Sequence, residues 1–224
     1  MLSLKSTKKF KEQSVRVFKL IGLAAMLIVS TALSAMTFEE GKHYEPLSPQ
    51  PPQGKLGDKI EVLEFFMFSC PHCYNFEPHV AKWKKSKAAD VEFIKVPAMF
   101  GRHTNMHGQA FYALESMGEL DRFHDAFFHE IHENRNGMKT REELDAFLQG
   151  QGVDMAAFNA AMKSFAVASK SNRAASLMRR YGITGVPSLV IDGRYKSGRG
   201  HTFESMLQMT DMLTDKVRNA RKTQ

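Results

Sequence analysis

The stretch that decides the fold reads IEVLEFFMFSCPHC and covers residues 60–73. Its first nine residues are apolar and aromatic enough for a buried strand, and this strand runs directly into two cysteines. From Pro71 onward, apolar side chains recur at helical spacing, at positions 73, 76, 80 and 83. Residues 91–96 predict a second strand, which gives a β-α-β unit with parallel strands and a right-handed crossover. The Cys-x-x-Cys motif is therefore predicted at a junction between a strand and a helix.

The middle of the chain, residues 104–180, lacks strand signals and is predicted to be helical. One apolar stripe at helical spacing consists of Leu120, Phe123, Phe127 and Ile131. Thr140-x-x-Glu143 is a capping box that predicts a helix start, and Gly150 is placed to end that helix. Asp154 is predicted to cap the next helix. The inner face of that helix is expected to carry Phe158, Met162 and Phe165.

Strand signals return at residues 188–191. Asp192-Gly193 follows as a strong signal for a two-residue hairpin turn, with a returning strand at residues 194–196. A last amphipathic helix carries on one side Phe203, Met206, Leu207, Leu213 and Val217. The predicted order is strand, helix, strand, helical block, hairpin and helix, with no internal repeat.

Residues 1–35 have the order of a secretory signal peptide, with a basic start, an apolar run at residues 20–29 and small residues at the end. The apolar run is about half the roughly 20 residues needed to span a bilayer, which argues against a permanent anchor. Ala32-x-Ser34 fits the rule that small residues stand at the first and third positions before the cleaved bond. Cleavage after Ala35 would instead place Leu33 at the third position before the bond. The mature chain is expected to begin near Met36, in an exported compartment that permits disulfides.

The net charge of +7 belongs mostly to this first segment. Residues 1–35 hold six of the 31 basic residues and one of the 24 acidic residues, so the remainder carries 25 against 23. The mature chain is therefore not expected to bind nucleic acid through charge. With 43% apolar residues in 224, the chain is long and apolar enough for a globular core.

Cys70 and Cys73 are the two cysteines of the chain, and four uses of their motif compete. A c-type haem site requires His after the second cysteine, where Tyr74 stands, so that use is excluded. A structural zinc site would have to recruit two histidines, and neither His72 nor His79 completes a zinc pattern. A structural disulfide across so small a loop would contribute only about 2 kcal/mol before strain. Reversible dithiol-disulfide chemistry fits best, without a metal, nucleotide or flavin.

The position of the motif predicts a role for each residue. Cys70 is expected to be the attacking sulfur, because a helix N-terminus leaves N–H groups free to stabilise a thiolate. Pro71 suits the first helical position, where its missing N–H costs nothing. His72 is predicted to stabilise the Cys70 thiolate further, with a solvated loop histidine as the alternative. Cys73, one turn inside the helix, is expected to be buried and to resolve the mixed disulfide.

Two further positions attract attention. Glu64 lies on the predicted buried strand, where a carboxylate is costly unless it has a partner. A proton-transfer role beside Cys73 is one interpretation, and a strand-edge residue that reaches solvent is the other. Pro187 precedes the hairpin, where a proline can begin a strand but cannot donate to its ladder.

Three motifs carry a family resemblance: EFF at residues 64–66, CPHCYNFE at residues 70–77 and GITGVPS at residues 182–188. Together they closely resemble the DsbA family, periplasmic thiol-disulfide oxidoreductases of the thioredoxin superfamily. The likeness covers the whole mature chain, from the FEEGKHY opening at residues 38–44 through the helical insertion. It implies an α/β thioredoxin fold with an inserted helical domain, in which residues 36–103 and 176–224 form the thioredoxin-like domain and residues 104–175 the insertion.

The resemblance also implies properties of the site. Val186–Pro187 is expected to be a cis bond beside the active site, where Gly185, Val186 and Pro187 shape the groove for substrate backbone. Glu64 and Glu77 are expected to set the charge around the cysteines.

The function expected on these grounds is a monomeric periplasmic oxidase that donates its Cys70–Cys73 disulfide to newly exported, unfolded cysteine-containing proteins. A DsbB-like membrane oxidase would reoxidise it. The alternatives are a specialised or reducing relative, and a non-catalytic periplasmic peptide-binding chaperone.

Overall fold

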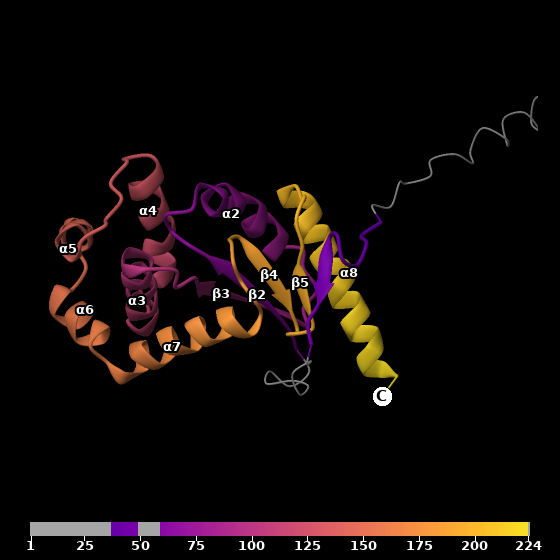
Figure 1. Cartoon of the computed structure of the whole chain (residues 1–224). Coiled ribbons are helices and arrows are strands. Elements are labelled where there is room, and N and C mark those ends of the chain that lie inside the picture. Colours follow the sequence, from indigo (N-terminus) through magenta and orange to yellow (C-terminus); the bar gives the residue numbers. More distant parts are fainter. Residues whose placement is uncertain (1–36, 49–58, 224) are drawn as a thin grey trace, which may run out of the picture. The chain divides into compact units, whose positions relative to one another are not determined.

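Strand β2 (Ile60–Phe66) lies inside a five-stranded sheet, and nearly all its side chains are buried. The computed structural model describes residues 37–48 and 59–223. The strands lie in the order β1-β5-β4-β2-β3. The other four are β1 (Tyr44–Pro46), β3 (Val91–Pro97), β4 (Ser188–Ile191) and β5 (Tyr195–Ser197). Strand β2 pairs in parallel with β3 and antiparallel with β4. Helix α2 (Pro71–Lys84) connects the two parallel strands, so the predicted β-α-β unit is confirmed (Figure 1).

The two sides of the sheet bury different helices. Ile60 and Val62 of β2 pack in a cluster with apolar residues of α2 and of the last helix, α8 (Phe203–Lys222). Leu63 and Phe65, which alternate with them, pack in a second cluster with the helical block. The indole N–H of Trp83 also donates a 2.8 Å hydrogen bond to Asp211, which ties α2 to α8. The helix that begins at the cysteines is therefore held by both the sheet and the C-terminal helix.

The helical block lies between β3 and β4 in the chain and at the left of Figure 1. Its helices are α3 (Arg102–Ser116), α4 (Leu120–His132), α5 (Arg141–Gly150), α6 (Met155–Met162) and α7 (Phe165–Arg180). The capping box of Thr140 with Glu143 and the cap of Asp154 are both present, as predicted. Whether residues 104–175 behave as a domain of their own stays a prediction.

One expectation within this block is wrong. Phe165 is 87% exposed, because α6 ends at Met162 and Phe165 is the first residue of the next helix rather than a continuation of the buried face. Helix α5 ends at Gly150, as predicted, and the left-handed backbone that follows belongs to Gly152, whose φ is 77°. A glycine suits that conformation because it lacks a Cβ.

The hairpin between β4 and β5 turns at Asp192 and Gly193, as predicted. Their φ angles of 52° and 63° are both positive, as a type I′ turn requires. Strand β1, which pairs antiparallel with β5 at the sheet edge, was not expected from the sequence. The predicted signal peptide and its cleavage site lie outside the described residues. Within the described part of the chain, no helix has the length and apolar character needed to cross a membrane.

Candidate active site

Cys70 occupies the N-cap of α2, where the chain turns from the end of β2 into the helix. Its backbone is extended, with φ −92° and ψ 116°, and its N–H donates to the carbonyl of Met67 at 3.1 Å. Pro71 is the first helical residue, as predicted. Cys73 lies one turn further and is buried. Both cysteines are free, so the structure is that of the reduced dithiol.

The attacking sulfur is less exposed than the sequence suggested. Cys70 is 8% exposed and Cys73 is fully buried. The segment before β4 approaches Cys70, and the carbonyl oxygen of Val186 lies 3.5 Å from its Sγ. The Val186–Pro187 peptide bond is cis, as the resemblance implied, and Gly185 beside it is exposed. Access to the pair is therefore limited to the Cys70 sulfur.

The pKa values of the two thiols move in opposite directions. The pKa of Cys70 falls from 9.0 to about 6, mainly because the Cys73 thiol donates a hydrogen bond to it. Burial opposes this shift, whereas the backbone N–H groups of Cys73 and His72 and the charge of the His72 side chain support it. Burial raises the pKa of Cys73 far above its usual value, and the nearby Cys70 and Glu64 add to the effect. The sequence predicted that the helix terminus and His72 would lower the pKa of Cys70. It did not predict the hydrogen bond from the Cys73 thiol, which is the largest cause.

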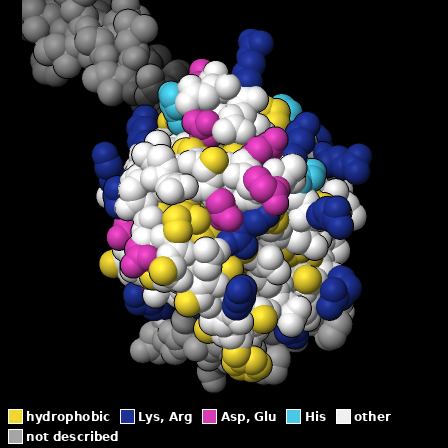
Figure 2. All heavy atoms as spheres, turned by 90° about the vertical axis from the view of Figure 1, so that its left-hand side faces the viewer, with side chains coloured by type: hydrophobic (Ala, Val, Ile, Leu, Met, Phe, Trp, Pro, Cys, Tyr) yellow, Lys and Arg dark blue, Asp and Glu magenta, His cyan; other side chains and the backbone are white. Residues whose placement is uncertain are grey.

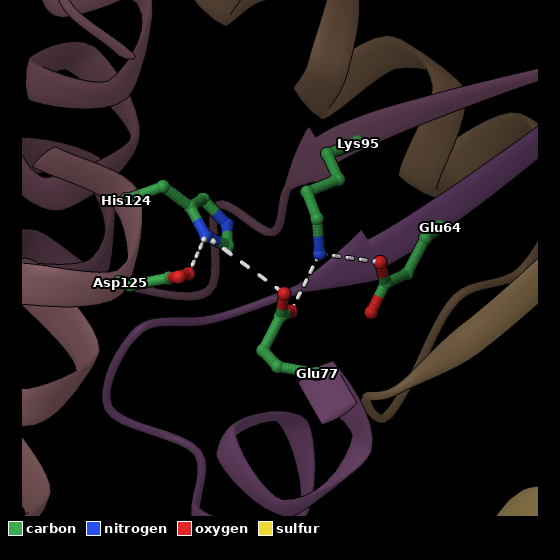
Figure 3. A network of polar contacts seen from close by, with 5 residues as sticks. All are labelled: Glu64, Glu77, Lys95, His124 and Asp125. Atoms are coloured by element: carbon green, nitrogen blue, oxygen red, sulfur yellow. Dashed lines mark hydrogen bonds and ion pairs between the residues drawn. The ribbon is translucent and has the colours of Figure 1, made fainter. Parts of the chain in front are cut away.

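Glu64 is fully buried, so the interpretation of a strand-edge residue that reaches solvent is wrong. It lies opposite Lys95 in the parallel register of β2 and β3. The Lys95 ammonium lies 2.8 Å from Glu64 Oε2 and 2.5 Å from Glu77 Oε1, and so bridges the two carboxylates (Figure 3). Burial, together with the charge of Glu64, raises the pKa of Glu77 to about 7 despite this contact. The other oxygen of Glu64 is buried and has no hydrogen-bond partner.

Helix α4 adds two residues that the sequence did not single out. His124 Nδ1 lies 3.2 Å from Asp125 Oδ1 and 3.8 Å from Glu77 Oε2 (Figure 3). Burial lowers the pKa of His124 to about 4, and the nearby Lys95 contributes, so its ring is neutral at pH 7. Donor atoms of Glu77, His124 and Asp125 lie within 4.8 Å of one another, close enough for a shared cation.

The end of α4 also contacts the turn that leads to Cys70. His132 Nε2 lies 2.8 Å from the carbonyl oxygen of Phe68. Its ring stacks on Tyr74 with centroids 4.8 Å apart. The Tyr74 hydroxyl donates a 2.9 Å hydrogen bond to Glu133. These contacts join residues more than 50 positions apart, so no local sequence pattern signals them.

Comparisons with known proteins show the family to which the chain belongs. Residues 94–210 match the family described as DSBA-like thioredoxin domain. The thiol:disulfide interchange protein DsbA of Pseudomonas aeruginosa is 40% identical over 206 residues, covering 89% of this chain and 97% of the relative. The Azotobacter vinelandii protein of that name is 40% identical over 200 residues, covering 88% and 93%. The crystal structure of Pseudomonas aeruginosa DsbA superposes with a TM-score of 0.77 at 41% identity, over 83% of this chain and 97% of that one.

Proposed function

The chain belongs to the DsbA family and is a thiol-disulfide oxidoreductase of the DsbA type, and on this premise we propose that Cys70 and Cys73 form the disulfide it donates. The observation that carries the proposal is the contrast between the two sulfurs. Cys70 is at the N-cap with a pKa of about 6, whereas Cys73 is fully buried with a raised pKa. A chaperone without thiol chemistry is not favoured by these relatives.

In the first exchange, a client thiolate attacks the Cys70 sulfur of the oxidised enzyme. A bond forms between the client sulfur and Cys70, the Cys70–Cys73 bond breaks, and Cys73 leaves with the electron pair and takes up a proton. Cys70 is the sulfur that is attacked because it retains exposed surface and Cys73 has none.

In the second exchange, another client thiolate attacks the client sulfur of the mixed disulfide. Cys70 leaves as a thiolate, the client gains a disulfide, and the enzyme keeps two electrons. Because the pKa of Cys70 is lowered from 9.0 to about 6, its thiolate is a better leaving group than an ordinary cysteine thiolate, and the reduced enzyme is stabilised relative to the oxidised one. This direction supports an oxidase rather than a reductase.

The surrounding residues are assigned supporting roles. Pro71 begins the helix, and His72 stabilises the Cys70 thiolate. Glu64 and Glu77 set the charge beneath the pair, and Glu64 is the candidate to exchange a proton with Cys73. Gly185, Val186 and Pro187 line the approach to Cys70 and receive the client backbone.

The partners follow from the same chemistry. The clients are newly exported, unfolded proteins with cysteines, and a DsbB-like membrane oxidase removes the two electrons. The protein acts as a monomer in the periplasm, after cleavage of its signal peptide, through its own disulfide and without a metal or organic cofactor.

Selective alkylation and trapping test this assignment. In the reduced protein at pH 6.5, iodoacetamide should modify Cys70 and leave Cys73 intact, as peptide mass spectrometry would reveal. The reduced Cys73→Ala variant should accumulate mixed disulfides with a client that already contains a disulfide: the Cys70 thiolate attacks one client sulfur, the other client sulfur leaves as a thiolate, and no Cys73 is present to attack Cys70 in turn. Equal modification of both cysteines, or equal trapping by Cys70→Ala, would contradict the assignment.

A further inference from the structure

A cleft of about 690 Å³ separates α2 from α4 next to the active-site motif. Tyr74, Ala81 and Phe128 give it apolar walls, and Glu77 and Asp125 place carboxylates in it. Tyr74 directly follows Cys73, so the cleft begins where the reactive motif ends. Of the residues that line the cleft, the mechanism above uses only Glu77.

The cleft carries more negative than positive charge. Of the residues that line the cleft, Glu77 and Asp125 are acidic, His129 is a histidine, and none is a lysine or arginine. Lys95 contacts Glu77 from outside this lining. His124, which faces Glu77 and Asp125, is neutral at pH 7. Lys84, at the end of α2, is exposed to solvent. Figure 2, which views the side of the helical block, shows acidic side chains gathered in the upper middle of this face, with lysines and arginines mostly towards its rim.

We propose that this cleft binds an arginine side chain of the client polypeptide while the client cysteine reacts with Cys70. The inference rests on the proposed thiol-oxidase function and adds a preference among clients. An arginine suits the cleft because its methylene stem packs on apolar walls while its planar guanidinium reaches carboxylates with several donors. Glu77 Oε2 and Asp125 both face His124 Nδ1, so they lie close enough for one guanidinium to bridge them.

The distance from Glu77 to the Cys70 sulfur determines how many residues separate the arginine from the cysteine in the client. Glu77 is seven residues after Cys70, which corresponds to about 10 Å along a helix at 1.5 Å per residue. An extended client strand rises about 3.3 Å per residue, so about three residues cover that distance. The preferred arginine therefore lies two to four positions from the client cysteine.

Peptides that differ in one residue test the proposal directly. Single-cysteine peptides carry Arg, Gln or Glu three residues before or three residues after the cysteine, and each reacts with the oxidised full-length protein. Acid quenching and mass spectrometry give the second-order rate constant for mixed-disulfide formation. With the wild-type protein, one Arg peptide should react about three- to tenfold faster than its Gln partner, the range expected for one charge-assisted contact at a partly exposed site. The Glu peptide should be slowest.

Two variants on α4 provide the matched comparison. Asp125 and Asp121 are both exposed on α4, and only Asp125 is among the residues that line the cleft. Asp125→Asn should bring the Arg and Gln rates within about twofold, whereas Asp121→Asn should keep the wild-type ratio. Equal Arg and Gln rates in the wild type, or the same loss in both variants, would overturn the arginine site but leave the oxidase intact. Failure of the wild type to react with any peptide would instead overturn the proposed function.

Discussion

Raising the pH from 5 to 8 should stabilise the reduced protein against unfolding, relative to the oxidised protein, by about 2.5 kcal/mol. The Cys70 thiol titrates with a pKa of about 6 in the folded protein and 9.0 when unfolded. Because the folded pKa is the lower one, its stabilisation is complete above pH 9 and is lost as the pH falls through 6. Between these limits the gain is about 1.4 kcal/mol per pH unit, and two such units lie between pH 6 and 8.

The assay is urea unfolding of both redox forms in steps from pH 5 to pH 8, and the quantity compared is the difference between their unfolding free energies. The disulfide has no ionisable thiol, so the oxidised form serves as the reference. Glu77, with its raised pKa of about 7, titrates in the same window. It is present in both redox forms, so its contribution largely cancels. The reduced Cys70→Ser variant is the control, and its stability should follow the pH dependence of the oxidised protein.

A difference that stays flat from pH 5 to 8 would refute the reasoning, because it would mean that the fold does not stabilise the Cys70 thiolate. A stability difference that decreases as the pH rises would also refute it, since the pKa of Cys70 would then be higher in the folded protein than in the unfolded protein.

Three other predictions follow from single contacts. His72→Ser should raise the pKa of Cys70, because one favourable charge is lost while the backbone N–H groups remain; thiolate absorbance at 240 nm measures it, and an unchanged pKa would make His72 a bystander. Lys95→Met should cost about 3–5 kcal/mol in urea unfolding, because it leaves two buried carboxylates without their shared cation. Lys59→Met is the control, because Lys59 pairs with the exposed Glu92, and it should lower the unfolding free energy by less than about 1 kcal/mol. Equal losses of stability in the two variants would contradict the role of burial. His132→Ala should cost about 1 kcal/mol for the lost hydrogen bond to the turn before Cys70, and full stability would show that the contact is not maintained in solution.

Apart from strand β1, the order of elements could be predicted because local signals mark them. The run from Ile60 is apolar throughout, Thr140 and Glu143 form a capping box, and Asp192-Gly193 matches a type I′ turn. The place of Cys70 at a helix start follows from the same local reasoning. The cis bond before Pro187 came from the family resemblance, since an X-Pro sequence alone does not distinguish it from a trans bond.

Contacts between distant elements could not be predicted in this way. Lys95 looks like an ordinary polar residue of a strand until the β2–β3 register places it opposite Glu64. His124 lies on another helix, and nothing in its neighbours signals that its ring faces Glu77. Phe165 was misplaced for the converse reason, because helical spacing continues across a break that the chain makes at Met162.

The packing of α2 on α8 makes the reactivity of Cys70 depend on a distant part of the chain. The helix that covers this side of α2 begins at Phe203, far along the chain from the reactive cysteine. Helix α2 has 14 residues, a length that is marginal for an isolated helix in water. Packing on the sheet and on α8 therefore keeps the backbone N–H groups of His72 and Cys73 in the positions from which they stabilise the Cys70 thiolate.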